Sequence, residues 1–311
     1  RLLCGTYIRP IMEQDGFVKE LNEKMLQIYL TLTYVAGEET FFKGLKKLMP
    51  GHWLEFKDGK LTVERYWTPS FAPDKTKSLD DWADEIHSTL AHIMTEVKEP
   101  NEVAESFLSG GVDSSYVLAM SDAKRADSCG YDEERFDESR VAAKTAELLG
   151  VEHSVAKIQP KDFFGIVPYV MYNMEQPLGD ASAIVFTLGC LATAKHTKLC
   201  YSGEGADEFF GGYNMYRNAE RYGDDLKNFY VGNTNIMKEE LKERILRNYD
   251  PTVLPINLVK HIYDETEGLD PLTKMSDVDI QIWLEGDIYL NVDKMSTCLL
   301  YTSPSPRDKR Q

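Results

Sequence analysis

The sequence predicts an α/β protein with a parallel sheet and helices on both faces, preceded by a β-rich segment. Short apolar runs alternate with amphipathic runs between residues 102 and 202, and that order is typical of parallel strands covered by helices. The first apolar run ends in Ser-Gly-Gly before a helical pattern, and the last ends in a second glycine-rich loop. Ligands of such sheets bind beyond the carboxyl ends of the strands, so both loops are candidate sites.

Composition narrows the class of protein. The chain has 311 residues, 42% of them hydrophobic, which is enough for a packed core in one large or two modest domains. Its net charge of −16 argues against a nucleic-acid partner, because phosphate backbones need clustered positive charge. No apolar run approaches the roughly 18 residues of a membrane span. We therefore expect no membrane partner and a cytoplasmic location.

The five cysteines form no CxxC pair. Their scatter fits neither a zinc site nor a disulfide framework, which favours free thiols in a reducing compartment.

The first 67 residues read as a helix followed by a β-hairpin. Residues 20–34 carry apolar side chains at helical spacing. Leu54 and Phe56 then share one face, and Leu61 and Val63 share another, across an Asp-Gly pair that is a strong hairpin signal. This segment is the β-rich part of the prediction.

A polar link leads into the α/β region. Ser78 is the expected N-cap of a helix, with Asp81 completing a pattern close to a capping box, and Trp82 is expected in the core. Strands are then predicted at 102–108, 126–131, 152–158 and 198–202, and helices at 114–122, 138–149, 160–174 and 184–196. Residues 215–293 read as mostly helical.

The loop after the first of these strands has the chemistry of an anion site. Its polar and glycine residues are Ser109, Gly110, Gly111, Asp113, Ser114 and Ser115. A helix N-terminus attracts anions, and glycines let the backbone approach a bulky phosphate. Asp113 has the wrong charge for phosphate, so we expect it to hold Mg²⁺. A capped strand-to-helix turn would explain these residues singly, whereas the complete set favours nucleotide binding.

The loop after the strand at 198–202 carries three acidic residues in five. Ser202 and Gly203 are followed by Glu204, and Asp207 comes shortly after. Carboxylates beside a phosphate site repel the ligand unless a metal intervenes, so a Mg²⁺ shared by Asp113 and Asp207 is expected.

These motifs resemble those of a known superfamily. The run SGGVDS lacks the spacing of a Walker A loop and resembles the PP-loop of ATP pyrophosphatases, which have a Rossmann-like fold. The run SGEGADEFFGGY resembles the asparagine synthetase signature. Residues 129–153, 174–184 and 291–296 are also similar to that family, so the resemblance covers nearly the whole chain.

The resemblance implies a glutamine-hydrolysing asparagine synthetase. Such enzymes convert aspartate to asparagine through β-aspartyl-AMP, release AMP and pyrophosphate, and take ammonia from glutamine in an N-terminal nucleophile domain. Carried over by motif, the PP-loop comprises Leu108, Ser109, Gly110, Gly111, Asp113, Ser114 and Ser115. Ser202, Gly203 and Glu204 line the ATP and adenylate site, Glu204 takes a proton from ammonia, and Asp113 and Asp207 hold Mg²⁺. A weaker placement puts Cys129 beside the adenine.

The resemblance also suggests domain limits. Residues 1–70 match only the closing part of the glutaminase domain, and residues 71–296 match the synthetase domain. Residues 297–311 fit no fold pattern and resemble a translated sequencing adapter, so we expect a disordered tail. The glutaminase cysteine and a later phosphate-contacting lysine are absent from this sequence, so we expect this chain alone to be inactive.

Other functions stay open at this point. One is a different adenylate-forming enzyme of the superfamily, similar to a β-lactam synthetase. A tRNA-modifying PP-loop protein would be expected to carry a basic face and often CxxC pairs, and a non-catalytic homologue would not need intact acidic residues. The sequence leaves the oligomeric state open, a homodimer included.

Overall fold

The computed structural model describes residues 2–97, 103–222, 225 and 230–299. The chain forms two compact units that are each discontinuous in sequence. The first unit comprises Arg1–Phe71, Met174–Asp180 and Gly205–Leu290, and the second comprises Ala72–Asn173, Ala181–Glu204 and Asn291–Gln311. The predicted tail at 297–311 lies outside the described residues from residue 300 onward, and residues 297–299 close the last helix.

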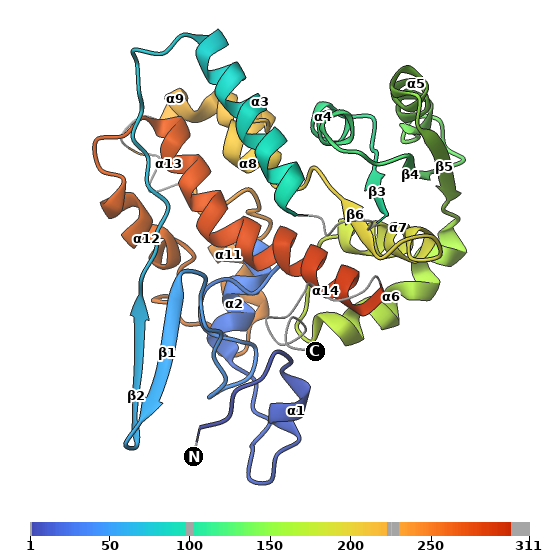
Figure 1. The fold of residues 1–311 in the computed structure, drawn as a ribbon. Coiled ribbons are helices and arrows are strands. Elements are labelled where there is room, and N and C mark those ends of the chain that lie inside the picture. The colour runs from blue at the N-terminus through green and yellow to red at the C-terminus, as the bar shows by residue number, and fades with distance from the viewer. Residues whose placement is uncertain (1, 98–102, 223–224, 226–229, 300–311) are drawn as a thin grey trace. The chain divides into compact units, whose positions relative to one another are not determined.

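The second unit contains the predicted parallel sheet (Figure 1). Its four strands are hydrogen-bonded in the order β5-β4-β3-β6, and each pair is parallel. The strands are β3 (Ala104–Phe107), β4 (Arg125–Gly130), β5 (Glu152–Lys157) and β6 (Leu199–Tyr201). The helices are α3 (Leu79–Glu96), α4 (Val112–Met120), α5 (Ser139–Leu149), α6 (Pro160–Met174) and α7 (Ser182–Thr193). The α/β prediction is confirmed, with β6 inserted beside β3.

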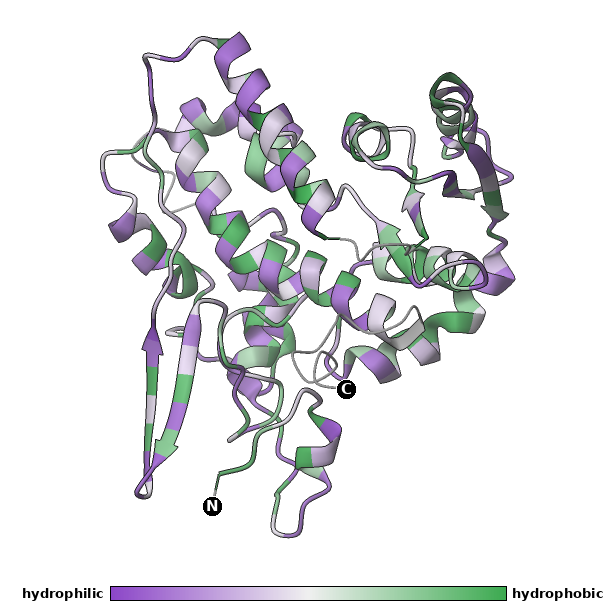
Figure 2. Ribbon diagram, in the orientation of Figure 1, coloured by the Kyte–Doolittle hydropathy of each residue, from purple (hydrophilic) through white to green (hydrophobic). Residues whose placement is uncertain are grey.

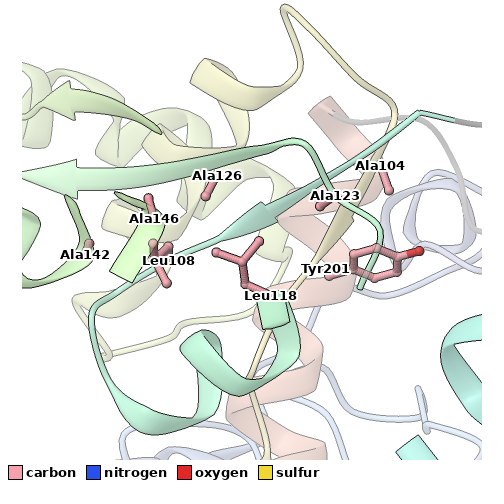
Figure 3. Close-up of a cluster of buried hydrophobic side chains, with 8 residues drawn as sticks. All are labelled: Ala104, Leu108, Leu118, Ala123, Ala126, Ala142, Ala146 and Tyr201. Atoms are coloured by element: carbon pink, nitrogen blue, oxygen red, sulfur yellow. The ribbon is translucent and has the colours of Figure 1, made fainter. Parts of the chain in front are cut away.

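Helices cover both faces of this sheet. Small side chains of the strands, such as Ala104 and Ala126, pack with Leu118 of α4 and with Ala142 and Ala146 of α5. Figure 3 shows this cluster. On the other face, the ring centroids of Phe107 of β3 and Phe186 of α7 lie 5.4 Å apart. Side chains alternate across a strand, so neighbouring strand residues reach opposite faces.

Helix α3 begins as the sequence indicates. Ser78 accepts a hydrogen bond from the backbone of Asp81, and the Asp81 carboxylate accepts from the backbone of Ser78, which is a complete capping box. The expectation that Trp82 lies in the core is wrong. The ring is half-buried, and the Lys77 ammonium lies 4.1 Å from its centre. A cation over an indole face is a stable arrangement near solvent, so this tryptophan does not need the core.

The first unit contains the predicted helix and hairpin. Helix α2 (Glu23–Leu32) is buried along one side, and the short helix α1 (Arg9–Met12) precedes it. Strands β1 (His52–Lys57) and β2 (Lys60–Arg65) form an antiparallel pair closed by the expected Asp-Gly turn. Hydrophilic and hydrophobic residues alternate along both strands (Figure 2).

The hairpin register corrects one expectation. Leu54 pairs with Val63, and Phe56 pairs with Leu61. Directly opposed residues point to the same side of a sheet, so all four side chains share one face instead of two. The sequence pattern fixed the alternation within each strand, whereas the turn length sets which residues face each other.

The described residues of the first unit from 205 onward are mostly helical, as predicted. The elements are α8 (Ala206–Phe210), η1 (Asn214–Asn218), α9 (Ala219–Tyr222), α11 (Glu239–Ile245), α12 (Ile256–Glu265), α13 (Pro271–Val278) and the π-helix η3 (Asp279–Ile288). Helix α14 (Tyr289–Leu299) runs from this unit into the second. The sequence predicted helix here and not the wider π period, which is rare and often found near functional sites.

Candidate active site

The loop between β3 and α4 is folded around its own serines. The Ser109 backbone donates to Ser114 Oγ at 3.1 Å, and the two hydroxyl oxygens lie 2.9 Å apart. The Gly111 backbone donates to Ser109 Oγ at 3.2 Å. Gly110 has a φ of +92°, which glycine adopts without strain, and a Cβ there would lie 3.1 Å from the Ala142 nitrogen of α5. Side-chain hydrogen bonds thus hold the loop in a fixed turn at the start of α4.

Two residues support the end of β3, which leads into this loop, and neither was predicted as a site residue from the sequence. Ser128 of β4 donates a hydrogen bond to the carbonyl of buried Leu108. His153 of β5 lies 2.8 Å from the same hydroxyl through Nε2. Because the hydroxyl proton is given to Leu108, His153 must donate through Nε2. Pairing between neighbouring strands brings these three residues together, so no local motif could have shown them.

The second glycine-rich loop lies directly against the first. A Cβ on Gly203 would be 2.9 Å from the backbone nitrogen of Ser114 and 3.0 Å from the carbonyl carbon of Asp113. Only glycine leaves room for this approach. The Glu204 backbone donates to Ser202 Oγ at 3.2 Å, which shapes the loop, and the Glu204 side chain is exposed. The structure therefore brings together Ser202, Gly203 and Glu204 with the start of α4, as the sequence predicted for one edge of a parallel sheet.

Cys129 is near the end of β4, the strand beside β3. Its thiol lies 3.7 Å from the carbonyl oxygen of Val185, and a Cβ on Gly189 of α7 would be 3.3 Å from its sulfur. Burial raises the pKa of the Cys129 thiol to about 11, so the group stays neutral. Among the described cysteines, Cys4, Cys129, Cys190 and Cys200 are free thiols.

An ion pair at the ends of β4 and β5 was also missed. Lys157 Nζ lies 3.0 Å from an Asp137 oxygen and donates to the Tyr131 carbonyl at 2.8 Å. Hydrogen bonds from Ser139 and from Lys157 lower the pKa of Asp137. Asp137 belongs to the acidic run after β4, and Lys157 is the last residue of β5.

Asp207 belongs to the first unit, in the first turn of α8. The helix is flanked by Gly205 and Gly211, both in the left-handed region. A Cβ on Gly212 would lie 1.9 Å from Asp207 Oδ1, so the carboxylate lies close over the Gly212 backbone and would have to move if a larger residue stood there. The next residue, Glu208, is buried and accepts a hydrogen bond from Tyr213 at 2.8 Å. The structure thus places Asp207 in one unit and Asp113 in the other.

The donors suit magnesium better than a softer metal. Among the described residues, no group of three or more histidine, cysteine, aspartate or glutamate side chains is arranged to hold a metal ion alone. Mg²⁺ in phosphate-transfer sites commonly uses only one or two carboxylates, with the remaining ligands from phosphates and water. Asp113, which is exposed in the first turn of α4, fits that pattern.

Two models of known protein families match this sequence. The family model described as asparagine synthase matches residues 88–299, which include both glycine-rich loops. The chain belongs to the asparagine synthase family. A second model, described as a glutamine amidotransferase domain, matches residues 1–67, which include the hairpin.

Curated relatives agree with the family. Asparagine synthetase [glutamine-hydrolyzing] 1 of Bacillus subtilis is 28% identical over 316 aligned residues, covering 89% of this chain and 50% of the relative. Asparagine synthetase [glutamine-hydrolyzing] 3 of the same organism is 26% identical, covering 74% of this chain and 39% of the relative. The chain thus spans half or less of the length of these relatives.

A solved structure gives a weaker comparison. The structure of the NH3-dependent NAD synthetase of Campylobacter jejuni matches 71% of the present chain, with 14% sequence identity and a TM-score of 0.36. A score this low carries no argument, so the fold rests on the parallel sheet itself. No helix in the described ranges is both long and apolar enough to cross a membrane.

Proposed function

We propose that this protein uses ATP to convert aspartate into asparagine through a β-aspartyl-AMP intermediate, with release of pyrophosphate and AMP. The observation that carries the proposal is the contact of Gly203 with the backbone of Asp113 and Ser114. It joins two glycine-rich loops at one edge of the sheet, where parallel α/β proteins bind their ligands. ATP is the nucleotide substrate that this arrangement suits.

The loop around the start of α4 would hold the phosphates. Backbone N–H groups at a helix N-terminus attract anions, and the hydroxyls of Ser109, Ser114 and Ser115 can donate to phosphate oxygens. Ser109 and Ser114 already hydrogen-bond each other, so they are oriented before the ligand arrives. An oriented set of donors loses little freedom on binding, which favours stabilisation of the leaving pyrophosphate.

The carboxylates would serve two roles. Asp113 and Asp207 are the proposed ligands of Mg²⁺, which would neutralise charge on the phosphates when bound. Glu204 is the proposed general base that takes a proton from ammonia as it attacks the aspartyl carbonyl. An exposed carboxylate beside the phosphate loop can reach a reacting group there, whereas the buried Glu208 is held by Tyr213.

Cys129 would line the adenine side of the site, whereas Leu108 begins the proposed phosphate loop. Leu108 is buried at the end of β3, and the neutral thiol of Cys129 presents a small surface at the end of β4. Ser202 and Gly203 complete the lining by the second loop. A neutral wall suits an uncharged base better than a thiolate would.

The remaining partners are proposed from the family. Aspartate is the acceptor, and glutamine or ammonia supplies nitrogen, with residues 1–70 belonging to the glutaminase domain and 71–296 to the synthetase domain. The match of residues 1–67 to a glutamine amidotransferase domain supports this division. The cytoplasmic location and a homodimer stay predictions.

The test is aspartate-dependent exchange of labelled pyrophosphate into ATP, measured on the full chain that the gene encodes. The wild-type protein should exchange only when aspartate is present. Asp113→Asn and Asp207→Asn should each lower the rate by at least about 100-fold, since they remove charge stabilisation in the transition state.

Thr76→Ala is the matched control, because Thr76 bonds Asp74 in the exposed link and lies outside both loops. Exchange with another amino acid in place of aspartate would contradict the substrate assignment. Near-normal exchange in both aspartate variants would contradict the metal role.

A further inference from the structure

A cavity of about 600 Å³ lies in the second unit, beyond the carboxyl ends of β4 and β5 and beside the start of α6. Tyr131, Phe163 and Phe164 form its aromatic walls, and Ile158 and Pro160 add apolar surface. The rings of Phe163 and Phe164 stand 5.4 Å apart at 79°. Phe164 is 71% exposed, so folding of this unit does not require its ring to be there.

Two carboxylates complete the lining. Asp132 and Glu133 belong to the cavity, and no lysine, arginine or histidine lines it. Gln159, also in the lining, donates to an Asp132 oxygen at 2.6 Å and so orients that carboxylate. The neighbouring Lys157 is held by Asp137.

The cavity lining shares no residue with the proposed ATP site. It includes neither Leu108 nor Cys129, and none of the serines of the phosphate loop. Its two carboxylates would repel a triphosphate, and an uncharged apolar ligand would bury them without a partner.

We propose that this cavity binds a small organic cation, an ammonium group carried on an apolar body. Aromatic faces attract ammonium groups through their quadrupoles, and alkylated ammonium ions are the ligands most often held by several rings. The carboxylates add a charge of the opposite sign at the same place. The volume matches sites that enclose small organic ligands.

The experiment titrates benzyltrimethylammonium into the full chain that the gene encodes, with binding followed by isothermal calorimetry and by ligand-observed NMR. Benzyl alcohol is the uncharged comparison and phenylacetate the anionic one. The test variants are Phe164→Ala and Glu133→Gln, which change exposed lining side chains.

The matched controls are Phe136→Ala and Glu134→Gln, whose residues lie on the loop that carries Glu133 and are not in the cavity lining. Circular dichroism verifies that all four variants are folded.

The cation should bind with a dissociation constant at or below the millimolar range, and the alcohol and the anion should bind at least ten-fold more weakly. Phe164→Ala and Glu133→Gln should each weaken the cation by about three-fold or more, as loss of one exposed cation–π or charge contact implies. Both controls should bind like the wild type. Absence of cation binding, equal binding of benzyl alcohol, or equal losses in the control variants would each overturn the proposal.

Discussion

At the scale of single residues, glycines and serines shape the candidate site more than charged groups do. The sequence predicted which residues form the two loops, because their order of strand, glycine and helix start is local. It could not predict that Ser128 and His153 support Leu108, because that contact depends on pairing between strands. The sequence also predicted that Trp82 lies in the core. Its ring is instead half-buried and lies beneath the ammonium of a nearby lysine.

Replacing Gly203 by alanine tests the contact between the loops. The added methyl would press on backbone atoms of Ser114 and Asp113 at 2.9 and 3.0 Å, and backbone cannot move aside as a flexible side chain can. We expect ATP affinity to fall at least ten-fold, with a loss of folding stability of about 1–3 kcal/mol from overpacking. Calorimetric titration and chemical denaturation measure the two effects.

Gly165→Ala is the control for that variant. Gly165 is inside helix α6, and a Cβ there meets nothing within 4 Å. Alanine should keep ATP affinity and raise stability by up to about 1 kcal/mol. Equal ATP affinity in the two variants would show that the loops need not touch.

Glu204→Gln tests the proposed general base. Glutamine keeps the shape of the exposed side chain and cannot accept the proton, so asparagine formation from ammonia should slow by about 100-fold or more. ATP affinity and aspartate-dependent exchange should stay within about three-fold of the wild type. A matching collapse of ATP affinity would make Glu204 a binding residue and not a base.

At the scale of elements, local signals were sufficient where the element is defined by its own sequence. The capping box of α3 and the Asp-Gly hairpin are both confirmed. Local sequence signals did not predict contacts between two elements. Glu105 of β3 and Asp127 of β4 are both buried, and Arg125 Nε lies 3.7 Å and 3.6 Å from their carboxylates. Neither strand alone shows that two acidic side chains share one guanidinium.

This carboxylate pair predicts a pH-dependent stability. Burial, followed by the hydrogen bond and charge of Asp127, raises the pKa of Glu105 to about 7 from an ordinary value of 4.5. Between pH 4.5 and about pH 7, the folded state therefore holds a proton that the unfolded state has lost. Its contribution to stability is fully present below pH 4.5 and is lost as pH rises through about 7.

The variant Glu105→Gln removes that titration. We expect the free energy of unfolding to fall less between pH 5 and pH 8 than in the wild type, by roughly 1–2 kcal/mol. Urea denaturation at several pH values measures it. Asp277, Asp279 and Asp287 of the first unit also have raised pKa values, of about 6 to 7, so part of the decline should remain.

Glu152→Gln is the control for this comparison. Glu152 contacts the same Arg125 at 2.8 Å, and its side chain is 69% exposed. The charge of Glu152 is the smallest of the causes that raise the pKa of Glu105, so its variant should change the pH profile much less than Glu105→Gln does. A profile that flattens equally in both variants, or in neither, would contradict the role assigned to Glu105.

At the scale of the whole molecule, linear sequence and compact structure divide the chain differently. The family models match residues 1–67 and 88–299, whereas residues 205–290 pack with the N-terminal segment. Gln27 of α2 donates to the carbonyls of Asp250 and Val253 at 2.9 and 2.8 Å, and buried Lys242 donates to Thr31 at 2.7 Å. Contacts between residues more than 200 positions apart leave no periodic signal, so sequence analysis could not find this packing.

The central claim is that the protein activates aspartate by joining it to AMP. The most direct test supplies aspartate labelled with oxygen-18 in its β-carboxylate, together with ATP, Mg²⁺ and ammonia, to the full chain that the gene encodes. Formation of β-aspartyl-AMP leaves one carboxylate oxygen on the phosphate when ammonia displaces AMP. Mass spectrometry should therefore find one oxygen-18 atom in the AMP for each asparagine formed. Asparagine formed with unlabelled AMP, or with ADP as the nucleotide product, would contradict the account.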